Sequence, residues 1–331
     1  MKKLKLGMMS LLLTSLILAD GPVLKTGQTL SYDVYGNVVT DNSIKDDGFY
    51  QTGKARKYSH IGSSVVLDHA TGLMWQDYYS DEVSYIKSDT WEEASVYCVN
   101  FALDGAGWRM PNIKELESIV NYGVYDSSVT SGVFSRIDSW KYWSSTSLAD
   151  DDDFAWNVGF YTGYSHFDTK VDDYYVRCVK GGLLESSNFT RNNQTKIVTD
   201  NLNALQWQDD TIVTTTTRTW SGAIDYCENT LELGGFDDWR LPNENELLSI
   251  ADRSRYNPAI DDTIFANTNS WFYWSSTTDA YRTTSALLVS FAYGSSLYVH
   301  KRNDQHYVRC VRGGKLKTST FLPSVIMYLF N

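Results

Sequence analysis

Trp-Arg-Met-Pro-Asn at residues 108–112 returns as Trp-Arg-Leu-Pro-Asn at residues 239–243, 131 residues further along the chain. Trp-Ser-Ser-Thr at residues 143–146 returns at residues 274–277 with the same shift. A period of this length is too long for a solenoid unit and has the size of a whole domain. The sequence therefore predicts two homologous globular domains in tandem.

The composition of the 331-residue chain is that of a folded protein. Tyrosine and tryptophan are frequent, with 23 and 11 residues, and only 21% of the residues are charged. This composition excludes general disorder and suits β-rich or mixed domains. The net charge of −11 disfavours binding to nucleic acid and to anionic membrane surfaces.

The start of the chain has the features of an export signal. Met1–Lys5 is basic, residues 6–18 are apolar, and Ala19 is a small residue at a plausible cleavage point. The apolar run is short for a membrane span, so we predict a signal peptide at residues 1–19, with an uncleaved anchor as the alternative. In both cases the rest of the chain is expected outside the cytoplasm, in the periplasm, at the cell surface or in the medium, where disulfides persist.

The repeats divide the remaining chain. An N-terminal arm with no counterpart before the second copy is expected to be loosely structured. The C-terminal tail is apolar but short and interrupted by Pro323, so we expect an added strand or packing between domains and not an anchor. The predicted segments are the arm 20–64, domain one 65–182, a linker 183–197, domain two 198–314 and the tail 315–331.

Four cysteines, two in each copy, allow three disulfide pairings. If each domain folds alone, only the pairs Cys98–Cys178 and Cys227–Cys310 keep both bridges internal. Metal binding by these residues is disfavoured, because the chain has no Cys-x-x-Cys pair and no histidine at ligand spacing from a cysteine.

Both copies have the same order of expected elements. Residues 90–102 place apolar side chains at helical spacing, with Thr90 and Glu93 as a capping box. A second helix is expected to start at Asn112, and at Asn243 in the second copy, where Asn-x-x-Glu follows a proline. The rest of each copy is strand-rich, so the order predicts an α+β domain whose first helix is bridged to its last strand.

These motifs, in this order and present twice, resemble the Lcl C-terminal domain family, which is named for the terminal domain of a bacterial collagen-like adhesin. The resemblance implies tandem C-type-lectin-like domains, each with two helices, an antiparallel sheet and one disulfide between the first helix and the final strand. It also implies a surface or adhesive role. The matching residues include Gly72–Trp75, Trp108–Asn112, Trp143–Thr146 and Val176–Val179, and then Trp239–Asn243, Trp274–Thr277 and Val308–Gly314.

The calcium-dependent sugar site of that fold cannot be carried over. Its Trp-Asn-Asp triplet stands here as Trp156-Asn157-Val158, without the final acid, and as residues 287–289, Leu-Leu-Val, in the second copy. The densest acidic run consists of Asp150, Asp151, Asp152 and Asp153. A divalent cation such as calcium is the functional interpretation of this run. A solvated loop is favoured, because the second copy has a single acid there, so no cofactor is certain and calcium is the one candidate.

Polar aromatic residues on hairpins near that loop are the candidate ligand-binding residues, because tyrosine combines an apolar face with a hydroxyl. The candidates are Tyr161, Tyr164 and His166 in domain one and Tyr281, Tyr293, Tyr298 and His300 in domain two. Arg109 and Arg240 are interpreted instead as buried partners of Glu115 and Glu246, with anion binding as the alternative. The repeated tryptophans are interpreted as core residues.

Motifs for catalysis are missing, because the chain has no Gly-x-Ser-x-Gly, no phosphate-binding glycine loop and no His-Glu-x-x-His. The sequence predicts an exported, non-catalytic binding or adhesion protein for a glycan or a surface protein, and not an integral membrane protein after signal cleavage. One alternative is a structural component of the cell envelope without a soluble ligand. Another is a divergent enzyme of the formylglycine-generating type, since Trp-Arg-Leu-Pro-Asn followed by Glu resembles a motif there. Those enzymes need redox-active cysteines, whereas the predicted disulfides use all four.

Overall fold

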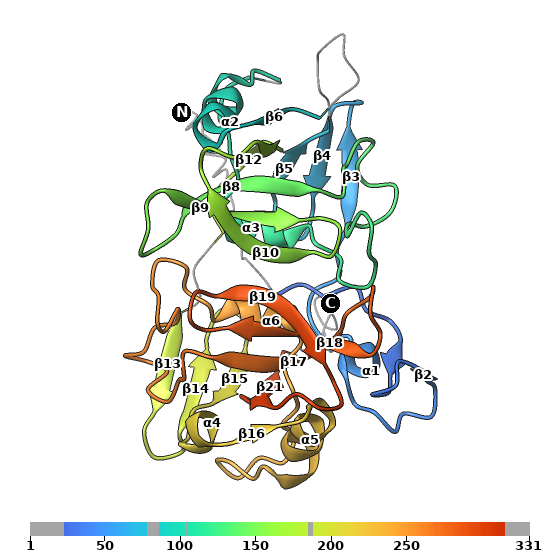
Figure 1. Cartoon of the computed structure of the whole chain (residues 1–331), viewed down its shortest axis with the longest axis vertical. Helices are drawn as coiled ribbons and strands as arrows, with labels where there is room; N and C mark the ends of the chain where they lie inside the picture. Colours follow the sequence, from blue (N-terminus) through green and yellow to red (C-terminus); the bar gives the residue numbers. More distant parts are fainter. Residues whose placement is uncertain (1–22, 78–85, 104, 185–187, 315–331) are drawn as a thin grey trace, which may run out of the picture.

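The computed structural model describes residues 23–77, 86–103, 105–184 and 188–314 (Figure 1). The predicted signal peptide and the apolar tail lie outside these residues. Within the described part of the chain, no helix is long and apolar enough to cross a membrane.

The two repeats have matching elements, which lie in the upper and lower halves of Figure 1. The arm contains β1 (Ser31–Tyr32), β2 (Val38–Val39) and α1 (Asp47–Tyr50). The first repeat contains β3 (Tyr58–Ile61), β4 (Val65–Asp68), β5 (Met74–Gln76), β6 (Ser88–Asp89), α2 (Trp91–Asn100), β7 (Trp108–Arg109), α3 (Ile113–Ser118), β8 (Lys141–Ser147), β9 (Phe154–Gly159), β10 (Tyr164–Thr169), β11 (Tyr174–Tyr175) and β12 (Val179–Lys180). The second repeat contains β13 (Phe189–Asn192), β14 (Ile197–Asp200), β15 (Leu205–Gln208), α4 (Ile212–Thr215), β16 (Thr217–Arg218), α5 (Trp220–Asp225), the π-helical turn η1 (Tyr226–Thr230), α6 (Glu244–Ser249), β17 (Phe272–Thr278), β18 (Ser285–Ser290), β19 (Ser295–His300), β20 (His306–Tyr307) and β21 (Val311–Gly313).

The predicted fold class is wrong. In place of C-type-lectin-like α+β domains, each with two helices and an antiparallel sheet, the chain forms mainly small antiparallel sheets in a four-bladed, propeller-like arrangement with few helices. In the first repeat the sheet orders are β10-β9-β8-β11-β6 and β3-β4-β5-β12-β7, and in the second they are β16-β20-β17-β18-β19 and β13-β14-β15-β21.

The reason for the error lies in the strand-rich part of each copy. Strands β11 and β12 follow each other closely but belong to different sheets, and β11 pairs with β8 in parallel. Alternation of apolar and polar residues marks a strand, but it does not tell which neighbour the strand will pair with. The helices are also short, since α3 and α6 have 6 residues each.

Several local predictions are confirmed. The disulfides are Cys98–Cys178 and Cys227–Cys310. Asn112 accepts a hydrogen bond from the N–H of Glu115, whose side chain accepts from the N–H of Asn112, and the second copy repeats this capping box. The capping box at Thr90 is not formed, because its hydroxyl donates to the Glu93 carboxylate and caps no backbone N–H.

The two repeats share one continuous core. A single cluster of buried apolar side chains draws residues from both, among them Trp75 and Trp207. The matching strands β10 and β19 face each other across the seam between the repeats (Figure 1). Burial of a common core means that the seam is part of the fold and not a loose contact.

The N-terminal arm is more ordered than the sequence predicted. Although it precedes the first repeat, it packs on the second, where the N–H of Thr278 donates to Gln28 Oε1 at 2.6 Å. Its far end reaches the first repeat, where Arg56 Nε donates to the backbone oxygen of Ser118 at 3.2 Å. The arm therefore ties the two repeats together on one side of the molecule (Figure 1).

Candidate functional site

The structure brings several predicted ligand-binding residues together at the seam between the repeats. The rings of Tyr164 and Tyr298 stack with centroids 5.7 Å apart, across strands β10 and β19. His166 lies beside Tyr164, with ring centroids 6.2 Å apart. Residues predicted on hairpins of two separate domains therefore pack against each other. Tyr293 contacts Phe167 at another point of the seam, and His300 is exposed at the end of β19.

Three exposed tyrosines form what we call the tyrosine cluster. Tyr281 of the second repeat lies between Tyr125 and Tyr161 of the first, with centroid distances of 5.2 Å and 5.5 Å. Their exposed fractions are 50% for Tyr125, 40% for Tyr161 and 44% for Tyr281. The Arg282 guanidinium lies 4.4 Å from the Tyr281 ring centroid and restricts that ring from the second repeat.

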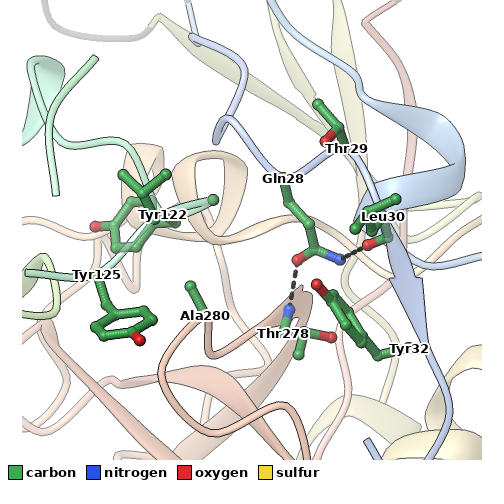
Figure 2. Close-up of a pocket in the computed structure, with 10 residues that line it drawn as sticks. Gln28, Thr29, Leu30, Tyr32, Tyr122, Tyr125, Thr278 and Ala280 are labelled. Atoms are coloured by element: carbon green, nitrogen blue, oxygen red, sulfur yellow. Dashed lines mark hydrogen bonds between the residues drawn. The ribbon is translucent and has the colours of Figure 1, made fainter. Parts of the chain in front are cut away.

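A pocket of about 260 Å³ lies next to the tyrosine cluster and shares Tyr125 with it (Figure 2). Its walls come from the arm, from the first-repeat segment 122–125 and from the loop after β17. Gln28 fixes the arm wall, because its amide accepts from Thr278 N–H at 2.6 Å and donates to Leu30 O at 2.8 Å. The lining residues are Gln28, Thr29, Leu30, Tyr32, Tyr122, Gly123, Val124, Tyr125, Thr278 and Ala280.

The pocket lining has no formally charged side chain. Tyr122 is 2% exposed, and burial raises the pKa of its phenol, so the ring stays neutral. Behind Thr278, the Lys301 ammonium donates to the Thr278 hydroxyl at 2.8 Å, and burial lowers the pKa of Lys301 to about 7. The lining therefore offers hydroxyl, amide and aromatic groups and no charged side chain, which suits an uncharged polar ligand.

Sequence reasoning found Tyr161 and Tyr281 but missed Tyr125 and the pocket. The pocket walls come from three segments that are far apart in the sequence, and one of them is the arm, for which the sequence predicted little structure. No motif marks such a site, because it exists only after the arm has packed on the second repeat.

One family model matches the chain twice, over residues 64–180 and 196–312, and it describes the Lcl C-terminal domain. The chain belongs to the Lcl C-terminal domain family. The two matched ranges confirm the tandem copies predicted from the repeated motifs. No curated protein sequence matches the chain. The Lcl C-terminal domain family is not a known enzyme family, and membership is compatible with a non-catalytic surface protein. Together with the disulfides, it suggests an exported protein.

The arginines of the repeated motif are structural in both Lcl C-terminal domain repeats. Arg109 donates to both carboxylate oxygens of Glu115 at 2.6 Å, and Arg240 does the same to Glu246 at 2.6 and 2.7 Å. The predicted ion pairs with Glu115 and Glu246 are confirmed, but only Arg240 is buried, whereas the Arg109 side chain is 28% exposed.

The two remaining chemical hypotheses gain no support from the geometry. All four cysteines of the chain are in disulfides, so no thiol is free for chemistry of the formylglycine-generating type. The side chains of residues 150–153 are exposed, and the described residues contain no group of three or more His, Cys, Asp or Glu placed to hold a metal ion. Asp151 Oδ1 accepts from Asp153 N–H at 3.0 Å, as in a solvated turn.

Proposed function

We propose that this protein is an exported, non-catalytic binding or adhesion protein that recognises a neutral glycan at the pocket and the tyrosine cluster. The observation that carries the proposal is an uncharged pocket that shares Tyr125 with a cluster of three exposed tyrosines. The pocket is at the small end for ligand sites, which suits a single sugar unit of a longer chain. Tyrosine faces can pack on the apolar side of a sugar ring, while Gln28 and Thr278 can hydrogen-bond its hydroxyls.

The charge of the chain argues for a neutral glycan over an acidic one. At a net charge of −11 the protein repels anionic polysaccharides on approach. A surface protein is the alternative ligand, since tyrosine and arginine are also frequent at protein interfaces. The side chains around the pocket favour the sugar, because they include hydroxyl and amide groups and no charge.

Binding to an array of immobilised glycans tests the proposal. The purified protein should bind a subset of neutral glycans, and Tyr125→Ala and Tyr281→Ala should each weaken binding at least about tenfold, since tyrosines that a ligand covers on binding can contribute more than about 1.4 kcal/mol. Tyr256→Ala is the matched control, because Tyr256 is the second-repeat counterpart of Tyr125, is 52% exposed and does not line the pocket.

The same array separates the alternatives. A chelator should leave binding unchanged, because no carboxylate lines the pocket. Absence of binding to every glycan, or binding that Tyr125→Ala and Tyr281→Ala leave intact, would exclude a sugar site here. Recovery of an envelope protein by the wild type but not by Tyr281→Ala would assign the tyrosine cluster to a protein ligand.

A further inference from the structure

The arm covers a surface of the second repeat whose counterpart on the first repeat is open. Thr277 and Lys301 of the second repeat have 0% exposure. Their counterparts Thr146 and Lys170, 131 residues earlier, are both partly exposed. The difference has a direct cause, because the arm packs on the second repeat and the described residues contain no second arm for the first repeat.

The open surface is built in the same way as the covered one. Lys301 Nζ lies 4.2 Å from the ring centroid of Trp220, and Lys170 Nζ lies 4.3 Å from that of Trp91. Trp220 is fully buried, whereas Trp91 is partly exposed. A lysine held over a tryptophan ring is therefore present on both repeats, and on the first repeat no segment of the described residues covers it as the arm does on the second.

The threonine near this lysine also has the same hydrogen bond in both repeats. Thr277 Oγ1 accepts from the N–H of Glu244 at 3.0 Å, and Thr146 Oγ1 accepts from the N–H of Ile113 at 3.0 Å. In both cases the backbone bond fixes the hydroxyl and leaves its hydrogen free to donate outward. The first repeat thus presents a preformed donor at the same place.

The arm shows which chemistry fits such a surface. Asp47, which is 1% exposed, accepts from the Thr277 hydroxyl at 2.8 Å. The Lys301 ammonium donates to the backbone oxygen of Tyr32 at 3.3 Å. Gly48 follows Asp47 where the arm folds back on itself, because a Cβ there would lie 2.2 Å from Leu30 O of the same arm. The occupant therefore places an acidic residue on the threonine hydroxyl, in a tight turn whose glycine lets the segment fold back on itself.

The helices beside the two surfaces differ, and this difference sets the specificity. Glu228 on η1 accepts from the Tyr50 hydroxyl at 2.8 Å and pairs with Lys45 at 3.5 Å. By the shift of 129 that relates Cys98 to Cys227, its counterpart is Val99, which is 68% exposed. Val96, which is 55% exposed, precedes Val99 by three residues on α2, so the two side chains are neighbours on the helix surface. An occupant of the first repeat must place apolar groups here, where the arm has Lys45 and the tyrosine hydroxyl.

We propose that the first-repeat surface formed by Trp91, Thr146, Lys170 and the exposed Val96 and Val99 binds a peptide segment of a partner protein. This segment has an acidic residue followed by glycine in a turn, and apolar residues opposite Val99. Among the described residues Lys170 has no carboxylate partner, so a carboxylate of an acidic segment can pair with its ammonium group. The arm of a second copy fits less well, because its own second repeat holds it and it would place Lys45 against Val99.

Two synthetic peptides of residues 30–53 test the proposal, one with the native sequence and one with Lys45→Leu and Tyr50→Phe. This range includes Tyr32, whose backbone oxygen accepts from Lys301 on the second repeat. The second repeat does not compete for them, because the tethered arm has a far higher effective concentration there. In calorimetric titrations of the purified protein, the substituted peptide should bind at least tenfold more tightly than the native one. Asp47→Asn in this peptide and Lys170→Met in the protein should each remove most of the binding.

Val99→Glu gives the sharpest variant, since it recreates the second-repeat chemistry at an exposed position. It should reverse the preference, so that the native peptide binds more tightly than the substituted one. Ile61→Glu is the matched control, an exposed apolar residue on β3 that should leave the preference unchanged. No binding of either peptide at millimolar concentration, or an unchanged preference in Val99→Glu, overturns the proposal. Self-association that Val99→Glu abolishes overturns the assignment to a partner protein in favour of a second copy.

Discussion

One buried ion pair joins the two repeats, and its removal should show how much the seam depends on it. Arg253 Nη2 lies 2.6 Å from Glu117 Oε1, and the side chains are 2% and 8% exposed. Glu117 lies on α3 of the first repeat, and Arg253 follows α6 of the second. A charge left alone at such a site costs far more than the pair contributes.

The expected magnitude follows from this asymmetry. Arg253→Met leaves the Glu117 carboxylate buried without its partner, so the free energy of unfolding should fall by about 3–5 kcal/mol. Replacing both partners should restore most of the loss, because an apolar pair of similar volume is often neutral or stabilising. The chain supplies the replacements, since the counterparts of Glu117 and Arg253 in the other copy are Leu248 and Tyr122. We therefore expect Glu117→Leu with Arg253→Tyr to be close to wild-type stability.

Urea unfolding followed by tryptophan fluorescence measures both effects. Burial already raises the pKa of Glu117, and the loss of Arg253 raises it further, so protonation relieves the lone carboxylate. The destabilisation by Arg253→Met should accordingly be smaller at pH 5 than at pH 8. A loss below about 1 kcal/mol in Arg253→Met, or a double variant as unstable as the single one, would refute the reasoning.

Three further predictions concern the arm and the disulfides. Burial raises the pKa values of Asp47 and Glu244 to about 7, so the folded chain retains protons that the unfolded chain releases near pH 4. The free energy of unfolding, measured in urea, should therefore fall as the pH rises from about 4 to 7. Asp47→Asn should make this dependence of stability on pH less steep. Cys227→Ala with Cys310→Ala, which removes a bridge between residues 83 positions apart, should lower the free energy of unfolding by roughly 4–5 kcal/mol, and an unchanged urea midpoint would contradict it. Gly48→Ala places a Cβ 2.2 Å from Leu30 O, so the arm should open at a cost of about 1–3 kcal/mol and become sensitive to limited proteolysis, whereas Gly182→Ala, where a Cβ meets nothing within 4 Å, should behave as wild type.

The features that the sequence predicts well are those that depend on neighbouring residues or on the repeat itself. Asn112 and Glu115 are three residues apart, so their capping box can be read locally and is confirmed. The pairing of Cys98 with Cys178 follows from the requirement that each copy keeps its disulfide within itself, and it is confirmed. The fold class failed because it depends on which strands meet, as β11 and β12 show by entering different sheets.

The candidate site could be predicted only in part, for a related physical reason. Tyr161 and Tyr281 were identified by residue type, but the sequence placed them on separate domains, and their contact at 5.5 Å depends on the packing of β10 against β19. Tyr125 and Gln28 had no pattern to mark them, because they become neighbours of the site only through the arm and the seam. Long-range packing of this kind leaves no local periodicity in the sequence.

The duplication nevertheless contains information that becomes readable once the structure is known. Lys170 and Lys301 occupy equivalent positions, each over a tryptophan ring, yet one is partly exposed and the other has 0% exposure. Residues that are identical at equivalent positions therefore indicate the fold that the two copies share. Residues that differ indicate what each copy contacts, since Glu228 faces the arm while its counterpart Val99 is exposed. Val96 and Val99 are exposed together on this helix, and a partner that covers both would remove their apolar surface from water. The divergence of this position is thus better explained by a different neighbour for each copy than by a solvated first-repeat surface.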